Sequence, residues 1–220
     1  MNQVSNLNGK QLTARGQRTR QELIDAAEGV FGEMGFERAS IAEITRRAGV
    51  ALGTFYVYFP HKEAIFIELV DGLGERLRQT LGRAVSPHRE RLEQERAGFK
   101  AFFEFAGKHR NLYRIVRQAE FVDEGVYHRY YGRLAEAYGR GLKRAMAKGE
   151  IGRFNPEVLA YALMGIADFI GMRFVVWDNP EALARITDEV IQFVKHGLLS
   201  AERLAKPAPK KARAKPTEKR

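Results

Sequence analysis

The stretch SIAEITRRAGVALGTFYVYFPHK, from Ser40 to Lys62, carries side chains suited to hydrogen bonding rather than to catalysis. Hydroxyl groups, lysines and helix N-termini bind phosphate oxygens, and threonine also reaches a base edge or a thymine methyl group. We therefore expect this stretch to contact double-stranded DNA. The predicted contact residues are Ser40, Gly53, Thr54, Tyr56, Tyr58, His61 and Lys62. On spacing alone, the alternative is a helical hairpin of any α-helical protein, in which the tyrosines only pack.

Two short helices are predicted to position these side chains. Ser40 and Glu43 match a capping box, in which the serine hydroxyl accepts from the first turn and the glutamate carboxylate reaches back. Gly49 then supplies the left-handed backbone of a sharp turn. The second helix covers residues 52–58 and must stop there, because Pro60 disfavours helical geometry at the preceding residue. Two helices joined in this way form a helix-turn-helix unit, whose second helix fits the major groove.

A further helix before this pair would complete a three-helix DNA-binding domain over residues 15–62. Thr19 and Glu22 repeat the capping-box pattern at its start. Apolar side chains then recur at helical spacing until Gly35, which predicts the end of the helix.

A basic arm precedes that helix. Residues 1–14 are polar and rich in asparagine, and we expect them to be disordered. The run from Lys10 to Arg20 holds four basic residues and no acidic one, which suits DNA phosphates or a minor groove. Arg15 and Arg20 are the predicted DNA contacts of this run, and a merely solubilising tail is the alternative.

The segment LIDAAEGVFGEMGFERASIAEITRRAGVALGTFYVYFPHKEAIF resembles the N-terminal signature of the tetracycline-repressor (TetR) family of transcriptional regulators. The similarity runs from about Thr19 to Leu69 and includes the A-G-V turn and the G-T-F-Y-x-Y-F helix. It implies that Ser40, Thr54, Tyr56, Tyr58, His61 and Lys62 contact operator phosphates and bases. Two residues depart from the pattern. Ala51 removes a side-chain cap from the second helix, and Leu52 stands where some relatives place a base-reading residue.

Length and composition indicate a globular protein. The chain has 220 residues, 45% of them apolar, and a net charge of +10, of which residues 206–220 carry +6. It has no cysteine, which fits a cytoplasmic protein, and its N-terminus lacks the apolar core of a signal peptide. The most apolar segment, from Tyr161 to Trp177, is interrupted by Asp168 and Arg173, so we expect no membrane span.

Helical periodicity continues through the rest of the chain, and no strand-like alternation occurs. Leucine and isoleucine recur every four positions from His61 to about Leu81, which predicts a long helix leaving the DNA-binding domain. We therefore expect an all-α protein, with a helical ligand-binding and dimerisation domain over residues 63–204. Residues 205–220 are rich in lysine, alanine and proline and are predicted to form a disordered tail.

Aromatic residues concentrate between positions 99 and 138, which hold ten of the 23 in the chain. A large aromatic core is one explanation. An apolar cavity for a small molecule is the other, and the resemblance favours it, because such regulators bind an inducer in this domain. The predicted lining residues are Phe103, Tyr113, Phe121, Tyr127, Tyr131, Met164 and Phe169.

A row of arginines lies beside the aromatic cluster. Arg110, Arg114 and Arg117 share a helix face, which is either a solvated surface or an anion site at the mouth of the cavity. An anion site joined to an apolar tunnel suits a fatty acyl-CoA, and the layout loosely resembles relatives that sense acyl-CoA. The alternative ligand is a cationic aromatic compound, for which Asp168 and Glu120 are the available carboxylates.

Two segments near 158–177 and 182–199 carry more apolar surface than one core contact needs. Gly165, Ala167 and Gly171 permit close helix approach. A fully buried central helix is one explanation, and half of a four-helix homodimer interface is the other. Two-fold symmetry would place two reading helices about one DNA turn apart on a palindrome.

The residues of an enzyme are not recognisable in this sequence. It has no HExxH motif, no glycine-rich phosphate loop and no nucleophile elbow, and its five histidines lack metal-ligand spacing. We expect no cofactor and no metal. The sequence instead predicts a ligand-responsive regulator, most simply a repressor released by its ligand. A carrier of acyl ligands without a DNA role is the alternative, to which Ala51 and Leu52 lend slight support.

Overall fold

The computed structural model describes residues 7, 11–177 and 183–198, which form helices and no β-strand. The prediction of an all-α protein is therefore confirmed. The predicted tail at 205–220 and most of the predicted arm at 1–14 lie outside the described residues. The helices are α1 (Ala14–Met34), α2 (Ile41–Ala48), α3 (Leu52–Tyr58), α4 (Lys62–Val85), α5 (Arg91–Lys108), α6 (Leu112–Val122), α7 (Glu124–Ala147), α8 (Pro156–Gly171), a π-helical turn (Met172–Trp177) and α9 (Leu183–Leu198).

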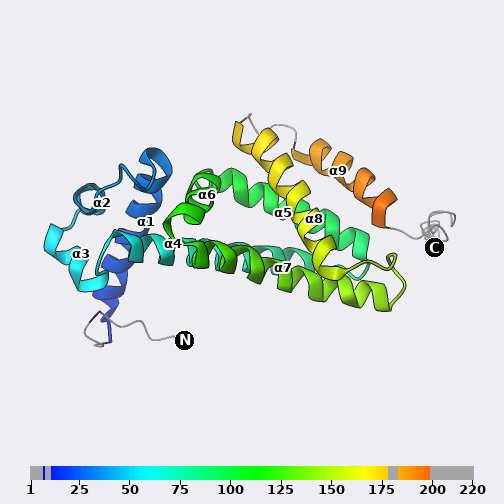
Figure 1. Cartoon of the computed structure of the whole chain (residues 1–220), viewed down its shortest axis with the longest axis horizontal. Helices are drawn as coiled ribbons and strands as arrows, with labels where there is room; N and C mark the ends of the chain where they lie inside the picture. The colour runs from blue at the N-terminus through cyan, green and yellow to red at the C-terminus, as the bar shows by residue number, and fades with distance from the viewer. Residues whose placement is uncertain (1–6, 8–10, 178–182, 199–220) are drawn as a thin grey trace, which may run out of the picture.

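Helices α1, α2 and α3 gather at one end of the long helix α4 (Figure 1). An aromatic cluster fills the space between them. The ring of Phe31 lies edge-on to Phe66 at 5.1 Å and stacks on Phe36 at 5.7 Å, while Phe55 and Phe59 are 5.6 Å apart. Burial of these rings fixes α1, α2 and α3 on the start of α4.

Helix α1 begins earlier than predicted. Thr13 is its N-cap, and its hydroxyl accepts a hydrogen bond from the Gly16 N–H at 3.2 Å. The capping box predicted at Thr19 and Glu22 is therefore wrong, because both residues lie inside the helix. No glycine-proline pair or other strong breaker separates Thr13 from Thr19, so the helix continues through the second threonine.

Helix α4 links the unit formed by α1, α2 and α3 to the rest of the molecule. The imidazole Nδ1 of His61 caps its first turn by accepting from the Ala64 N–H at 3.2 Å. Its buried face runs from Ile65 to Leu77 and contacts α1 at one end and α5 and α7 further along. A single rigid element thus joins both halves of the chain.

The remaining helices pack around the distal part of α4. Helices α5 and α7 run alongside it, α8 crosses α5 and α7 obliquely, and α9 lies against α5 on the outside (Figure 1). Local signals set several ends: Gly149 ends α7 at a φ of 66°, and the Asn155 side chain caps α8 at the Glu157 and Val158 N–H groups.

The segment Pro156–Trp177 is the part of the described chain that is long and apolar enough to cross a bilayer, with a mean hydropathy of 1.6. Only 28% of its most apolar 18-residue stretch is buried within the protein. Val158, Tyr161 and Phe169 are among its exposed apolar side chains. The fold therefore leaves a wide apolar surface on α8.

Candidate functional sites

The helix-turn-helix unit has the predicted geometry. Ser40 Oγ accepts from the Glu43 N–H at 3.2 Å, Gly49 adopts the left-handed conformation at a φ of 68°, and α3 begins without a side-chain cap at Ala51. Phe55 is fully buried against the other helices. The start of α2, the turn and the bounds of α3 are thus confirmed.

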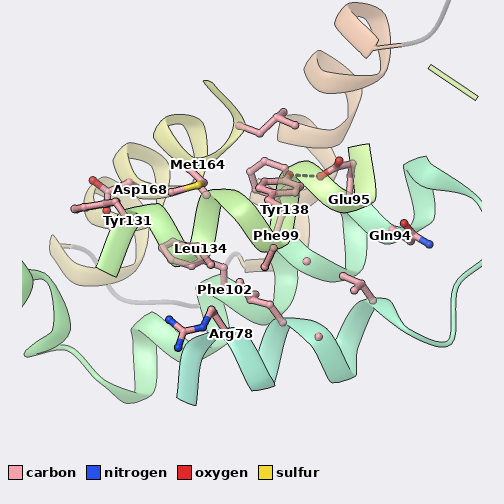
Figure 2. Close-up of a pocket in the computed structure, with 18 of the residues that line it drawn as sticks. Arg78, Gln94, Glu95, Phe99, Phe102, Tyr131, Leu134, Tyr138, Met164 and Asp168 are labelled. Carbon is pink, nitrogen blue, oxygen red and sulfur yellow. Dashed lines mark hydrogen bonds between the residues drawn. The ribbon is translucent and has the colours of Figure 1, made fainter. Parts of the chain in front are cut away.

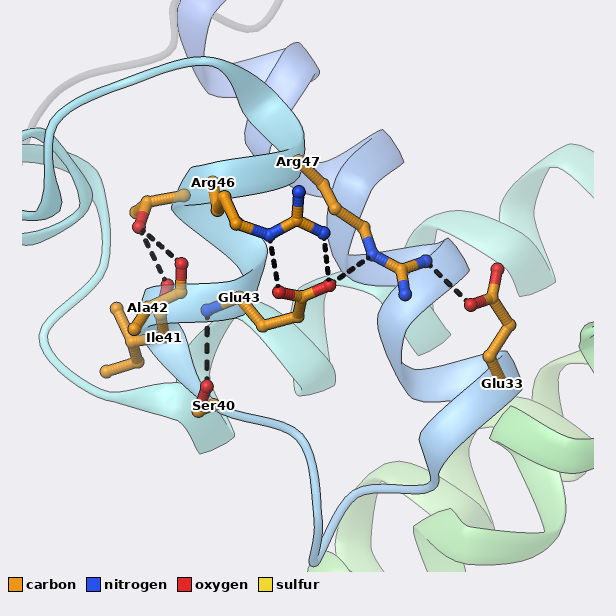
Figure 3. Close-up of polar contacts among 8 residues, drawn as sticks. Glu33, Ser40, Ile41, Ala42, Glu43, Arg46 and Arg47 are labelled. Atoms are coloured by element: carbon orange, nitrogen blue, oxygen red, sulfur yellow. Dashed lines mark hydrogen bonds and ion pairs between the residues drawn. The ribbon is translucent and has the colours of Figure 1, made fainter.

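One part of the predicted capping box is wrong. The carboxylate of Glu43 does not reach back to the cap but accepts from Arg46 Nε at 2.7 Å and Arg47 Nε at 2.8 Å (Figure 3). Arg47 also pairs with Glu33 of α1 at 2.8 Å. Hydrogen bonds from Arg46 and Arg47 lower the pKa of Glu43 to about 2. The result is a charged clamp that holds α2 against α1.

Helix α3 presents a mixed face to solvent. Leu52 and Tyr56 are each 51% exposed, Gly53 is exposed, and Thr54 is half-buried. These side chains can reach a DNA groove without disturbing the core. Tyr58 is half-buried at the end of the helix, and the ring of His61 remains exposed while it caps α4. Their predicted contacts, and that of the exposed Arg15 at the start of α1, stay predictions.

Two predicted DNA contacts have other partners. The Lys62 ammonium donates to the carbonyl oxygens of Phe36 at 2.8 Å and Ala39 at 3.1 Å, and lies 4.2 Å from the Phe36 ring centroid. Arg20 forms an ion pair with Glu68 and lies 5.0 Å from the Phe59 ring centroid. Both cations therefore brace the domain internally in this structure, and their predicted DNA contacts stay predictions.

A cavity of about 490 Å³ lies between helices α4, α5, α6, α7 and α8. Its middle is apolar and is lined by side chains such as Phe102, Leu134 and Met164 (Figure 2). This volume and lining are typical of sites for small molecules. The predicted cavity in the C-terminal domain therefore exists, although its walls differ in part from the expected ones.

The predicted ligand residues divide into two sets. Those that line the cavity are Tyr113, Arg117, Tyr131, Met164 and Asp168. Those outside its lining are Phe103, Arg110, Arg114, Phe121, Tyr127 and Phe169. For the second set the expectation of a lining role is wrong, for reasons that differ between the side chains.

Burial and helix rotation explain these errors. Phe103 is fully buried in the core beside Phe99 and Phe102, whereas Phe121 is 87% and Phe169 is 65% exposed. Tyr127 packs on Tyr131 at 5.0 Å, behind the lining, and Arg110 is exposed. Which face of a helix meets the cavity depends on its rotation within the bundle, which periodicity alone does not define.

A buried polar network at one end of the cavity was missed. Arg91 and Glu95 form an ion pair in which Arg91 Nε lies 2.7 Å from Glu95 Oε1, and the Tyr138 hydroxyl donates to the same carboxylate. Both charged side chains are buried. The four-residue spacing of Arg91 and Glu95 was visible in the sequence, but such pairs are usually surface features.

Asp168 and three tyrosines surround the opposite end. The Tyr113 hydroxyl donates to the Asp168 carbonyl oxygen at 3.2 Å. Burial raises the pKa of the Asp168 carboxyl group, and nearby Arg117 partly opposes that shift. Burial, with the Asp168 charge in addition, raises the pKa values of Tyr113, Tyr130 and Tyr131, so their hydroxyls stay neutral.

Helix α6 touches both sites. Tyr113, Val116 and Arg117 line the cavity from α6. From the same helix, Arg114 Nη1 donates to the Gly32 carbonyl oxygen at 3.0 Å, and Gln118 Oε1 accepts from the Phe36 N–H at 2.5 Å. Only glycine fits at position 32, because a Cβ there would lie 2.0 Å from Asn111 Cγ. Helix α6 is therefore packed directly on the end of α1.

Comparison with known proteins gives a match to a family of regulators. Residues 23–69 match the family described as bacterial regulatory proteins, tetR family. The chain is 30% identical over 185 residues to the HTH-type transcriptional regulator BetI of Serratia proteamaculans, which covers 78% of this chain and 90% of that protein.

Two further proteins extend the comparison. The A-factor receptor protein of Streptomyces griseus is 31% identical over 191 residues, which cover 85% of this chain but only 65% of the length of that relative. Among solved structures, the transcriptional regulator FadR from Bacillus subtilis, in complex with stearoyl-CoA, has a TM-score of 0.69 at 22% identity and covers 79% of this chain and 96% of that chain. At this identity the likeness supports the fold alone.

Proposed function

Because the chain belongs to the TetR family of bacterial regulatory proteins, whose members bind DNA operators and dimerise, we propose that it is a cytoplasmic repressor that leaves a palindromic operator when a ligand fills its cavity. The observation that supports this proposal most directly is that α6 contacts both the cavity and helix α1. One face of α6 lines the cavity, and Arg114 and Gln118 bind the end of α1. A ligand that displaces α6 therefore moves the DNA-binding domain with it.

The proposed DNA-reading surface is the exposed face of α3. Gly53, Thr54 and Tyr56 project from a helix held by buried Phe55 and Phe59. Placing such a helix in the major groove would let Thr54 reach base edges, while Ser40 and His61 at helix N-termini contact phosphates. The operator sequence depends on these few contacts.

The proposed dimer interface is the apolar surface of α8 and α9. Phe169 on α8 and Phe193 on α9 are 65% and 72% exposed, which is unusual for large apolar side chains. A bilayer is a poor partner for this surface, because Asp168 and Arg173 lie within the same apolar segment. A second copy of α8 and α9 would complete a four-helix interface and set the spacing of two α3 helices.

The proposed ligand is an elongated apolar molecule, with a long-chain acyl-CoA as the first candidate. The apolar middle of the cavity suits an acyl chain, and Arg117 and Arg144 are arginines at its lining. The similar fold of FadR, which was solved in complex with stearoyl-CoA, supports this choice. A cationic aromatic compound is the second candidate, favoured by the Asp168 carboxylate among the tyrosine rings.

Fluorescence anisotropy on DNA from upstream of the gene tests the proposal. We expect tight binding that weakens steeply with salt, and release on addition of palmitoyl-CoA. Leu134→Trp, which fills the middle of the cavity, should bind DNA normally but lose the response. Phe121→Trp, at an exposed position outside the lining, is the matched control and should respond like the wild type.

Other results would overturn parts of the proposal. If the protein binds DNA tightly and is released by a cationic aromatic compound but not by palmitoyl-CoA, the ligand is a cationic aromatic compound and not an acyl-CoA. Ligand binding by calorimetry, without any preference for the upstream DNA over unrelated DNA, would favour an acyl-ligand carrier.

A further inference from the structure

The two ends of the cavity carry different polar groups. Asp168 and Tyr131 lie at one end, and Glu95 and Tyr138 lie at the other (Figure 2). Apolar side chains, including Leu134, separate the two ends. A ligand that spans the cavity is therefore elongated and meets a different polar environment at each end.

The Glu95 end has an excess of positive charge. Glu95 is only 2% exposed, and its two oxygens already accept from Arg91 and Tyr138. Arg144, an exposed residue of the lining, lies at the solvent edge of this end, since its Nη2 is 3.9 Å from the position of a Cβ on Gly141. Among the residues described, Arg144 has no carboxylate partner. This end therefore suits the carboxylate group of an acyl chain.

The Asp168 end needs a hydrogen-bond donor. No side chain within the described ranges donates a hydrogen bond to the Asp168 carboxylate, although it is partly buried in the cavity wall. The one donor close to Asp168, the Tyr113 hydroxyl, is directed at its backbone carbonyl. A partly buried carboxylate without a donor costs free energy that a ligand can recover.

The missing group is a neutral donor rather than a second cation. Arg117 lines the cavity together with Asp168, and its Nη2 donates to Met172 Sδ at 3.0 Å, about one helical turn after Asp168, while its guanidinium has no carboxylate partner in the part of the chain that the structure describes. Positive charge is thus already present beside Asp168. An ammonium group placed there would also face Arg117, whereas a hydroxyl group would donate a hydrogen bond without that repulsion.

We propose that the ligand is a hydroxylated acyl chain, whose head group lies near Arg144 and whose chain hydroxyl donates a hydrogen bond to Asp168. This inference rests on the proposed function, because it takes the cavity to be an acyl-chain site. It adds a chemical distinction between hydroxylated and plain chains, and it names Asp168 as the residue that makes the distinction.

Isothermal titration calorimetry of the full chain tests this assignment. The probes are palmitate, palmitoyl-CoA, hexadecylamine and hydroxypalmitates that carry the hydroxyl near the carboxyl group, in mid-chain or at the terminal carbon. We expect at least one hydroxypalmitate to bind about tenfold more tightly than palmitate, as for a hydrogen bond to a charged group. Asp168→Leu should lose this preference and bind palmitate at least as tightly as the wild type does.

The control variant is Glu157→Leu, which removes an exposed acid from the same helix outside the cavity and should keep the preference. Thermal unfolding identifies any variant that fails to fold, and Asp168→Asn then serves as the milder replacement, with a reduced preference expected.

Equal affinity of wild-type protein for palmitate and every hydroxypalmitate would overturn the inference alone. Tighter, Asp168-dependent binding of hexadecylamine would overturn it in favour of a cation. Failure of every acyl probe to bind would overturn the proposed function as well.

Discussion

At the scale of single residues, neighbours in the sequence have divergent roles. Tyr56 and Lys62 are six positions apart, and both were predicted to contact DNA. Tyr56 projects into solvent, whereas the Lys62 ammonium is held by two backbone carbonyl groups of the segment that joins α1 to α2. The first residue is free to bind DNA, and the second maintains the domain that presents it.

Substitution separates these two roles. Tyr56→Ala should lower operator affinity without a change in melting temperature. Lys62→Met should lower the free energy of unfolding by about 1–3 kcal/mol, since two hydrogen bonds from a charged donor are lost. Thermal unfolding and DNA-binding anisotropy measure both effects. If Lys62→Met melts like the wild type yet binds DNA weakly, its ammonium contacts phosphate after all.

The ion pairs of Glu43 make the free energy of unfolding depend on pH. Its pKa is lowered from 4.5 to about 2 by Arg46 and Arg47, so its charged form stabilises the folded state. That contribution is fully present above pH 4.5 and is lost as the pH falls through about 2. Glu43→Gln should therefore melt below the wild type at neutral pH, and the difference should vanish near pH 2. Melting curves over this range measure it, and a difference independent of pH would contradict the clamp.

At the scale of elements, α6 is the helix that connects the two sites. Its cavity face and its DNA-domain face lie on one short helix of 11 residues, so they move together. Helix α4 also spans both halves of the chain, but its buried face packs along most of its length. The buried apolar face of α6, made by Tyr113, Ile115, Val116 and Ala119, is shorter than that of α4, so α6 is the easier of the two helices to displace.

Breaking the α6 hydrogen bonds should uncouple ligand from DNA. In Arg114→Ala/Gln118→Ala, palmitoyl-CoA should bind with unchanged affinity, while its effect on operator affinity falls from about a hundredfold to below about tenfold. Calorimetry measures the first quantity and anisotropy the second. Glu120→Ala, exposed on the same helix and without these contacts, is the control. Full ligand response in the double variant would assign the coupling to another helix.

At the scale of the whole molecule, exposed apolar surface is concentrated on α8 and α9 and on the turn between them. Trp177 of the π-helical turn is 65% exposed, in addition to Phe169 and Phe193. Elsewhere in the described chain the exposed large apolar side chains are more scattered, with Leu52, Tyr56 and Val57 on α3 and Phe121 on α6, while a single continuous core buries most of the others. The simplest partner for the exposed set is the same surface of a second copy.

Phe193→Asp should convert the dimer to a monomer, because a carboxylate would be buried without a partner at the interface. Operator affinity should fall at least about a hundredfold, since each monomer then contacts only one half-site. Sedimentation velocity measures the mass, and anisotropy measures the affinity. Phe121→Asp changes an exposed phenylalanine on α6 and should remain dimeric. A Phe193→Asp protein that stays dimeric would place the interface elsewhere.

Local chemistry determined much of this protein from its sequence. Ser40, Gly49 and Gly149 set helix ends through caps and left-handed turns, which involve only neighbouring residues, and their predictions are confirmed. The helix-turn-helix unit followed from these signals. Where two local signals compete, as at Thr13 and Thr19, the sequence did not show which of them begins the helix.

Tertiary structure decided which side chains share a site. Tyr113 and Asp168 were predicted to meet in a cavity and do, whereas Phe121 and Phe169 were predicted there and face outward. The Arg91–Glu95 pair is indistinguishable in sequence from a surface ion pair, because the Tyr138 hydroxyl that meets it comes from α7, 43 residues further along the chain. Helix periodicity defines an apolar stripe but not the rotation and neighbours of that stripe in the bundle, and these depend on contacts between residues far apart in the chain.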